Sequence, residues 1–153
     1  MKNILILGIG NQLMMDDGIG IYLIDELKKF KYERELEFIA GESDINYCLA
    51  QIERASFVII LDAMVADKEP GEVYVYALDT LHEQKMLDIS PHNLHLFEVM
   101  HHHQRNKLHG YLIGIEPSEV RFHIGLSENI QTQWPVIIKE VKRKIERLIG
   151  MKG

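Results

Sequence analysis

Short apolar runs alternate along this chain with longer segments of periodic hydrophobicity. Residues 3–9 and 57–63 are continuously apolar, which is typical of strands buried on both faces of a parallel sheet. Residues 35–40 and 110–116 are two further strand candidates. Residues 72–78 alternate between apolar and polar positions after a Glu-Pro-Gly turn signal, which favours an edge or antiparallel strand. The pattern therefore predicts about five strands.

Four other segments carry apolar residues at helical spacing. Their stripes are Ile19, Leu23, Leu27 and Phe30; Ile45, Leu49 and Ile52; Leu94, Phe97 and Val99–Met100; and Ile130, Trp134, Ile137, Val141, Ile145 and Leu148. Asp16 or Asp17 is available to cap the first helix. Strands that alternate with helices predict an α/β fold, a three-layer sandwich whose mostly parallel twisted sheet has helices on both faces. We expect a single domain over residues 1–153, long enough to bury its own core.

Composition narrows the class of protein. The formal net charge of −6 argues against a binder of nucleic acid or anionic membranes, because both functions need a basic face. No apolar run reaches membrane-spanning length, and the apolar start is too short for a signal peptide. The single cysteine, Cys48, cannot form an internal disulfide, and its apolar mid-helix position predicts a buried structural thiol. We therefore expect a cytoplasmic protein with no nucleic-acid or membrane partner.

The segment GIGNQLMMDDGIG at residues 8–20 looks at first like a phosphate-binding loop. Gly8 and Gly10 match the first two glycines of the dinucleotide fingerprint, but Leu13 stands at the third position. Asp16 and Asp17 lie where the helix begins, and carboxylates there repel phosphate. No Lys–Ser/Thr pair follows, which excludes a Walker loop. Helix capping explains one of these two acids. The presence of a second acid favours a site for a cation.

Asp62 and His92 are the other candidates at the same edge of the sheet. Asp62 ends an otherwise apolar strand, and ligands gather at the carboxyl ends of parallel strands; capping of the next turn is its alternative role. His92 follows a Ser-Pro pair at the start of a predicted helix, and His95 can share its face. Two carboxylates and an imidazole suit a divalent ion such as Zn, Ni or Mn. The run His101–His103 diverges around a helix and is interpreted as a solvated helix end, whereas His123 is either structural or part of the cleft.

Four blocks of the sequence resemble the nickel-dependent hydrogenase maturation endopeptidases. The blocks are ILGIGNQLMMDDGIG, VIILDAMV, ISPHNLHL and LIGIEPSEVRFHIGLS, and together they span nearly the whole chain in the same order and spacing. The resemblance implies that Asp17, Asp62 and His92 contact nickel and carry the catalysis, and that Asp16 caps the helix or supports these ligands. Many members have Glu at the position of Asp17, and Asp also occurs there.

This family removes a C-terminal extension from the large subunit of [NiFe] hydrogenase after nickel has been inserted. The resemblance therefore implies an endopeptidase whose partner is the large-subunit precursor and whose nickel arrives with that substrate. Cd or Zn is expected to replace nickel in a crystal. Gly41, in the segment AGESD, matches a family loop near the cleft that helps to seat the substrate tail. We expect a monomer, which suits an enzyme that docks on a much larger protein.

Two alternatives from other classes stay open at this point. The first is a nucleotide-dependent α/β enzyme that uses the Gly8–Gly10 loop, and the second is a nickel-binding maturation chaperone that keeps the ligands without cutting. The nucleophile is open as well, because the residue types suit a metal-polarised carbonyl, a metal-bound water or a carboxylate acting as base.

Overall fold

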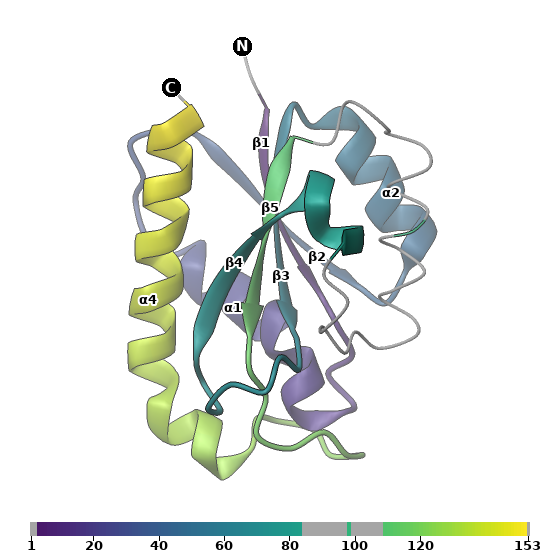
Figure 1. Ribbon diagram of the computed structural model, residues 1–153, viewed down its shortest axis with the longest axis vertical. Helices are drawn as coiled ribbons and strands as arrows, with labels where there is room; N and C mark the ends of the chain where they lie inside the picture. The colour runs from purple at the N-terminus through teal and green to yellow at the C-terminus, as the bar shows by residue number, and fades with distance from the viewer. Residues whose placement is uncertain (1–2, 84–97, 99–108, 153) are drawn as a thin grey trace.

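The protein is built on a twisted five-stranded sheet with the strand order β2-β1-β3-β5-β4 (Figure 1). A computed structural model describes residues 3–83, 98 and 109–152. The strands are β1 (Ile4–Ile9), β2 (Leu36–Glu42), β3 (Phe57–Ala63), β4 (Val73–Ala77) and β5 (Gly110–Ile115). The first three and β5 run parallel, whereas β4 pairs antiparallel with β5 at one edge. Both the continuous apolar strands and the alternating edge strand confirm the sequence prediction.

Helices cover both faces of this sheet, which confirms the predicted three-layer α/β sandwich. Helices α1 (Ile19–Leu27) and α4 (Glu128–Lys152) lie on one face, and α2 (Ile45–Arg54) lies on the other (Figure 1). Two short 3-10 helices complete the described elements, η1 (Met15–Gly18) before α1 and η2 (Leu78–Glu83) after β4. The predicted helix around Leu94–Met100 lies outside the described residues, apart from the helical position Glu98. No helix in the described part of the chain is long and apolar enough to cross a membrane.

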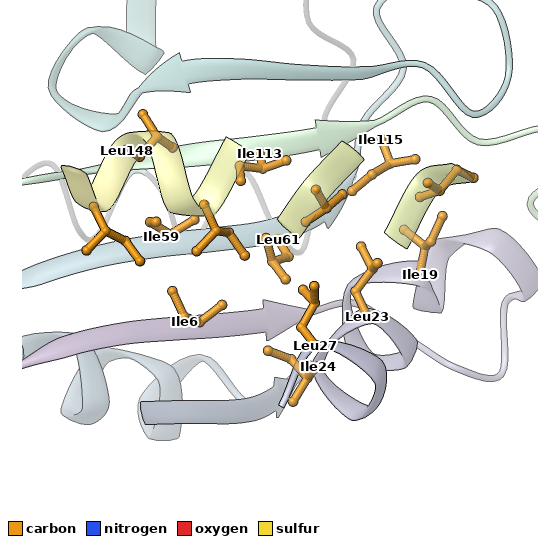
Figure 2. Packing of buried hydrophobic residues seen from close by; sticks show 14 of the residues in the cluster. Ile6, Ile19, Leu23, Ile24, Leu27, Ile59, Leu61, Ile113, Ile115 and Leu148 are labelled. Atoms are coloured by element: carbon orange, nitrogen blue, oxygen red, sulfur yellow. The ribbon is translucent and has the colours of Figure 1, made fainter. Parts of the chain in front are cut away.

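The core is divided by the sheet into two apolar layers. Because side chains alternate along a strand, Ile4 and Ile6 of β1 pack toward α1 and α4, whereas Leu5 and Leu7 pack toward α2. Figure 2 shows the first layer, in which strand residues Ile6, Ile59, Leu61, Ile113 and Ile115 meet Ile19, Leu23, Ile24 and Leu27 of α1 and Leu148 of α4. Each fully buried Leu or Ile contributes about 1.5–3 kcal/mol to folding.

Two details of the first helix differ from the sequence prediction. The helix ends at Leu27, so Phe30 leaves the apolar stripe and is 43% exposed, with the Lys142 ammonium 5.3 Å from its ring centroid. The residue before the helix, Gly18, is its N-cap and makes no side-chain cap, so neither Asp16 nor Asp17 caps α1. Both acids lie within η1 instead, which turns the chain before the helix begins.

Helix α1 approaches the sheet so closely that only glycine fits at the contact. A Cβ atom on Gly20 would lie 2.3 Å from the Leu61 carbonyl oxygen and 2.6 Å from the Ile9 carbonyl oxygen. A Cβ atom on Gly8 would lie 2.3 Å from the Gly20 carbonyl oxygen. Since backbone atoms cannot move aside cheaply, these two glycines fix where α1 starts. They also fix where η1 sits over the ends of β1 and β3.

Gly20→Ala tests this contact, because helix propensity and packing predict changes of opposite sign in the free energy of unfolding. Propensity alone would raise the free energy of unfolding by about 1 kcal/mol, whereas the backbone collision is expected to lower it by about 3 kcal/mol. Gly150→Ala in α4 is the matched control, since a Cβ there meets nothing within 4 Å and only the propensity gain applies. Urea unfolding followed by circular dichroism measures both. Equal stabilities for the two variants would contradict the close approach.

Candidate functional site

The predicted acids lie at the carboxyl edge of the sheet, where β1, β2 and β3 end at Ile9, Glu42 and Ala63. The 3-10 helix η1 carries Asp17 and lies against β3. Asp62 is the last but one residue of β3 and is fully buried. By strand alternation it shares the α2 face of the sheet with Ile60 and Met64. The contact between η1 and β3 therefore places Asp17 and Asp62 at the same edge of the sheet.

The glycine loop closes on Asp17 and leaves no cradle for phosphate. The Gly10 N–H donates to the Glu42 carbonyl oxygen at 3.1 Å, and the Asn11 N–H donates to Asp17 Oδ2 at 3.1 Å. The Leu13 N–H donates to Asn11 Oδ1 at 2.9 Å. A Cβ atom on Gly10, whose φ is +137°, would lie 2.1 Å from the Asp17 carbonyl oxygen. The amides that a phosphate would need already donate to Glu42, Asp17 and Asn11, and the Asp17 carbonyl group fills the space beside Gly10, which argues against the nucleotide-dependent alternative.

Asp16 ties this loop to a segment more than a hundred residues away. Its carboxylate is fully buried and accepts the Ser118 N–H (2.9 Å), the Glu119 N–H (2.9 Å), the Ser127 N–H (2.7 Å) and the Ser127 hydroxyl (2.7 Å). Ser127 directly precedes α4, and its Oγ accepts the Ile130 N–H at 3.4 Å. Of the two roles expected for Asp16, capping of α1 is therefore wrong. It holds the start of α4 and residues 118–127 against η1.

Residues 118–127 also pair with the loop through their backbone. The His123 N–H donates to the Leu13 carbonyl oxygen at 2.9 Å, and the Met15 N–H donates to the His123 carbonyl oxygen at 2.9 Å. The His123 side chain is exposed. Of the two roles expected for His123, the structural role is supported. The backbone N–H and carbonyl groups of His123 fill this role, not its imidazole.

Glu116 is a buried carboxylate that the sequence analysis did not single out. Its Oε1 accepts the Ala66 N–H at 2.9 Å and the Lys68 N–H at 3.3 Å, and lies 3.2 Å from the Tyr74 hydroxyl. Burial and the neighbouring Glu116 charge raise the pKa of Tyr74. Glu116 thus orders the loop that follows Asp62. The sequence does carry a signal for Glu116, because this acid directly follows an apolar strand, just as Asp62 stands at the end of the apolar strand β3.

A pocket of about 630 Å³ opens at the carboxyl edge between the glycine loop and the start of α2. Its lining residues are Gly10, Asn11, Gln12, Ala40, Gly41, Glu42, Ser43, Asp44 and Tyr47. Asn11 belongs both to this lining and to the hydrogen bond that holds Asp17. Gly41, expected near a cleft, lies in the wall of the pocket.

Comparison with known proteins decides the family. The family model described as hydrogenase maturation protease HycI matches residues 21–144 of the chain. The chain belongs to the hydrogenase maturation protease family.

A Methanocaldococcus jannaschii protein that carries the same family description is 30% identical, over 97% of this chain and 96% of its own length. The hydrogenase 2 maturation protease of Escherichia coli is 27% identical, over 90% of this chain and 87% of its own. The solved structure of the E. coli hydrogenase maturating endopeptidase HybD superposes with a TM-score of 0.75 at 25% identity, covering 91% of this chain and 89% of that one. The resemblance inferred from the four sequence blocks is confirmed, and with it a protease that acts in hydrogenase maturation.

The described part of this maturation protease holds two of the three residues expected to contact nickel. Asp17 and Asp62 both lie at the carboxyl edge, while His92, His95 and the run His101–His103 lie outside the described residues. Within residues 3–83 and 109–152 no group of three or more His, Cys, Asp or Glu side chains is arranged to hold a metal ion.

Cys48 of the protease is buried beneath the pocket, as predicted from its apolar position. Its Sγ lies 3.6 Å from the Gly41 carbonyl oxygen, and a Cβ on Gly41 would lie 2.4 Å from this sulfur. Burial, with a smaller contribution from the Asp44 charge, raises the pKa of the thiol to about 11. A protonated, enclosed thiol cannot act as the nucleophile of a protease at neutral pH.

Asp16→Asn is expected to lower the free energy of unfolding by about 3 kcal/mol. The amide keeps one acceptor oxygen but turns an NH₂ donor toward backbone N–H groups, so buried donors lose their partner. Urea unfolding measures the change, and hydrogen exchange at the Ser118, Glu119 and Ser127 amides locates it. Asp25→Asn is the control, because Asp25 is 60% exposed and its ion pair is with the similarly exposed Lys28, so a change within about 0.5 kcal/mol is expected. Equal effects of the two substitutions would contradict the role assigned to Asp16.

Cys48 is expected to be unreactive toward Ellman's reagent at pH 8 in the folded protein and to react within seconds in 8 M urea. The raised pKa and the burial both keep the thiolate away from the reagent. Rapid labelling of the folded protein at pH 8 would show that the thiol is exposed and would reopen its role in catalysis.

Proposed function

We propose that this protein is an endopeptidase that removes the C-terminal extension of a nickel-loaded [NiFe] hydrogenase large-subunit precursor. The observation that supports the proposal is the placement of Asp17, on η1 against β3, and of Asp62, near the end of β3, at one edge of the sheet in a chain of this family. In this proposal the two carboxylates, which follow different strands, contact a single bound ion or peptide group.

Asp17 is held for this purpose by its own loop. The Asn11 N–H fixes Oδ2, and the Gly20 contact with the sheet fixes the position of η1. Asp62 is placed by the paired strands β1, β3 and β5. Carboxylate oxygens with the His92 imidazole form a donor set that suits nickel, and we assign His92 as the third group that contacts it. Asp17 and Asp62 are thus preorganised, which lowers the free-energy cost of engaging a substrate ion.

In this proposal nickel belongs to the substrate and not to the enzyme. Three protein ligands at most leave coordination positions for the cysteines of the large subunit that carry the ion. A precursor without nickel offers the two carboxylates nothing to bind, so cleavage waits until the metal has been inserted. The reaction adds one water across the peptide bond and releases the extension with a new amino terminus. Asp17, Asp62 and His92 position that bond and its metal, and a carboxylate is available as the base.

Asp17→Asn, Asp62→Asn and His92→Ala are each expected to lower the rate of processing at least 100-fold, because each removes a group that touches the reacting centre. The assay incubates purified protease with nickel-loaded precursor and follows loss of the extension by gel mobility and mass spectrometry. Thermal melts check that each variant is folded. Asp25→Asn and the triple variant His101→Ala, His102→Ala, His103→Ala are controls expected to process at the wild-type rate.

The same assay separates the alternatives. If all three site variants process at the wild-type rate, the site is misassigned. If the wild-type protein binds the nickel-loaded precursor but never shortens it, the protein is a nickel-binding maturation factor without protease activity. Stabilisation in a thermal melt by NAD or ATP, with none by Ni or Cd, would favour the nucleotide-dependent enzyme.

A further inference from the structure

Three residues form a row across neighbouring strands at the candidate site. Asp62 of β3 is paired with Gly114 of β5, and Gly114 is paired in turn with Tyr74 of β4, the antiparallel strand at the edge of the sheet (Figure 1). Side chains that are paired in register across strands point to the same face of a sheet. Tyr74 therefore shares the α2 face with Asp62, and the residue between them in the row has no side chain.

The Tyr74 ring occupies the space above Gly114. A Cβ atom on Gly114 would lie 2.8 Å from Cε2 of the ring and 3.4 Å from Met64 Cβ. From this position the Tyr74 hydroxyl donates to the Met64 carbonyl oxygen. The edge strand β4 thus reaches across β5 and bonds to the backbone two residues after Asp62.

Glu116 holds the same stretch of chain from the end of β5. Its side chain is buried, and its Oε1 accepts the Ala66 N–H at 2.9 Å and the Lys68 N–H at 3.3 Å. The Tyr74 hydroxyl lies 3.2 Å from the same oxygen, so the two side chains form one network. Residues 64–68, which begin two positions after Asp62, are therefore held against β4 and β5 by these two side chains.

The sheet itself does not depend on the polar groups of Tyr74 and Glu116. Strands β3 and β5 are joined by their own backbone pairing, and apolar layers cover both faces. Placing a carboxylate beside a phenol hydroxyl is costly, and both burial and the Glu116 charge raise the pKa of Tyr74. Apolar side chains of similar size would fill this space at lower cost. The polar pair is therefore explained by the fixed geometry that it gives residues 64–68.

We propose that Tyr74 and Glu116 are positioning residues, which hold the Asp62 carboxylate in place for cleavage by fixing the chain that follows it. The inference rests on the proposed function, because it concerns a carboxylate assigned there to contact the reacting centre. Asp62 is the last residue but one of β3, so the strand fixes the chain before it and the hydrogen-bonded loop fixes the chain after it. Displacing a reacting group by about 1 Å can lower a rate about a hundredfold. Loss of this network should therefore slow cleavage while the substrate still binds.

Tyr74→Phe tests the hydrogen bond, because it removes the hydroxyl and keeps the ring over Gly114. The kcat for nickel-loaded precursor is expected to fall about tenfold with KM unchanged, in a variant that a thermal melt shows to be folded. Tyr76→Phe is the matched control. Tyr76 lies on the same strand with its ring centroid 5.5 Å from that of Tyr74, and its hydroxyl makes no hydrogen bond with any described residue. A wild-type kcat for Tyr74→Phe, or an equal loss in Tyr76→Phe, would overturn the inference.

Two substitutions of Glu116 separate loop geometry from charge. Glu116→Gln keeps an acceptor oxygen for the Ala66 and Lys68 N–H groups, so its kcat is expected to stay within about twofold of wild type. Glu116→Met has a similar size and no such acceptor, and its kcat should fall about tenfold. Equal losses in the two variants would show that the charge matters and not the position of the loop, and no loss in Glu116→Met would contradict the role of Glu116.

Two measurements follow the geometry without the reaction. Tyr74→Phe is expected to shift the carbon-13 resonance of the Asp62 carboxyl group and to speed hydrogen exchange at the Ala66 and Lys68 amides, whereas Tyr76→Phe should change neither. A wild-type protein that responds in this way but never cuts disproves the protease proposal and leaves the positioning of Asp62 intact. Normal cleavage, together with an Asp62 resonance that ignores the Tyr74 hydroxyl, does the reverse.

Discussion

The buried carboxylate of Asp16 is the interaction on which the candidate site depends. Placing a charge in the interior costs several kcal/mol unless it is hydrogen-bonded, and Asp16 accepts four bonds from three residues. These bonds join η1 to residues 118–127 and to the start of α4. Asp17 is the next residue in η1, so the cross-link made by Asp16 also holds the candidate ligand. Apolar burial adds one residue from each segment, Met15 and Leu126, whereas Val120, Phe122 and Ile124 are exposed to solvent.

The same chemistry recurs along the carboxyl edge. Backbone N–H groups at loop and helix ends are natural anion sites, and here carboxylates of the chain itself occupy them. Asp17 takes the Asn11 N–H, Asp44 takes the Tyr47 N–H, and Glu116 takes the Ala66 N–H. Each carboxylate satisfies a donor and brings a full negative charge to the edge. The result is an edge with hydrogen-bonded loops and acidic side chains, the residue type that the proposed contact with a nickel-bearing substrate requires.

Much of the fold could be predicted from the sequence because burial leaves a direct mark on it. A strand covered on both faces must be continuously apolar, which is why residues 57–63 were found with their observed bounds. The end of α1 could not be found this way, because Phe30 keeps the helical spacing while Lys142 and solvent hold it outside the core. The different roles of Asp16 and Asp17 could not be predicted from the sequence either. It depends on which carboxylate faces Ser118 and Ser127, and that contact is made only in the folded chain.

The glycine loop shows why a fingerprint can indicate a structure and still mislead about the ligand. In a dinucleotide site the glycines let a pyrophosphate and a helix come close to the strand end. In this chain Gly8 and Gly20 admit the helix, and the space beside Gly10 is filled by the carbonyl group of Asp17. In a dinucleotide site and in this chain alike, the glycines indicate that another group comes close to the backbone. The neighbouring side chains determine whether that group is a ligand or part of the protein. Because the Asp17 carbonyl group fills the space beside Gly10 and the Asp17 carboxylate accepts the Asn11 N–H, a loop with the glycines of an anion site carries a carboxylate in place of the anion.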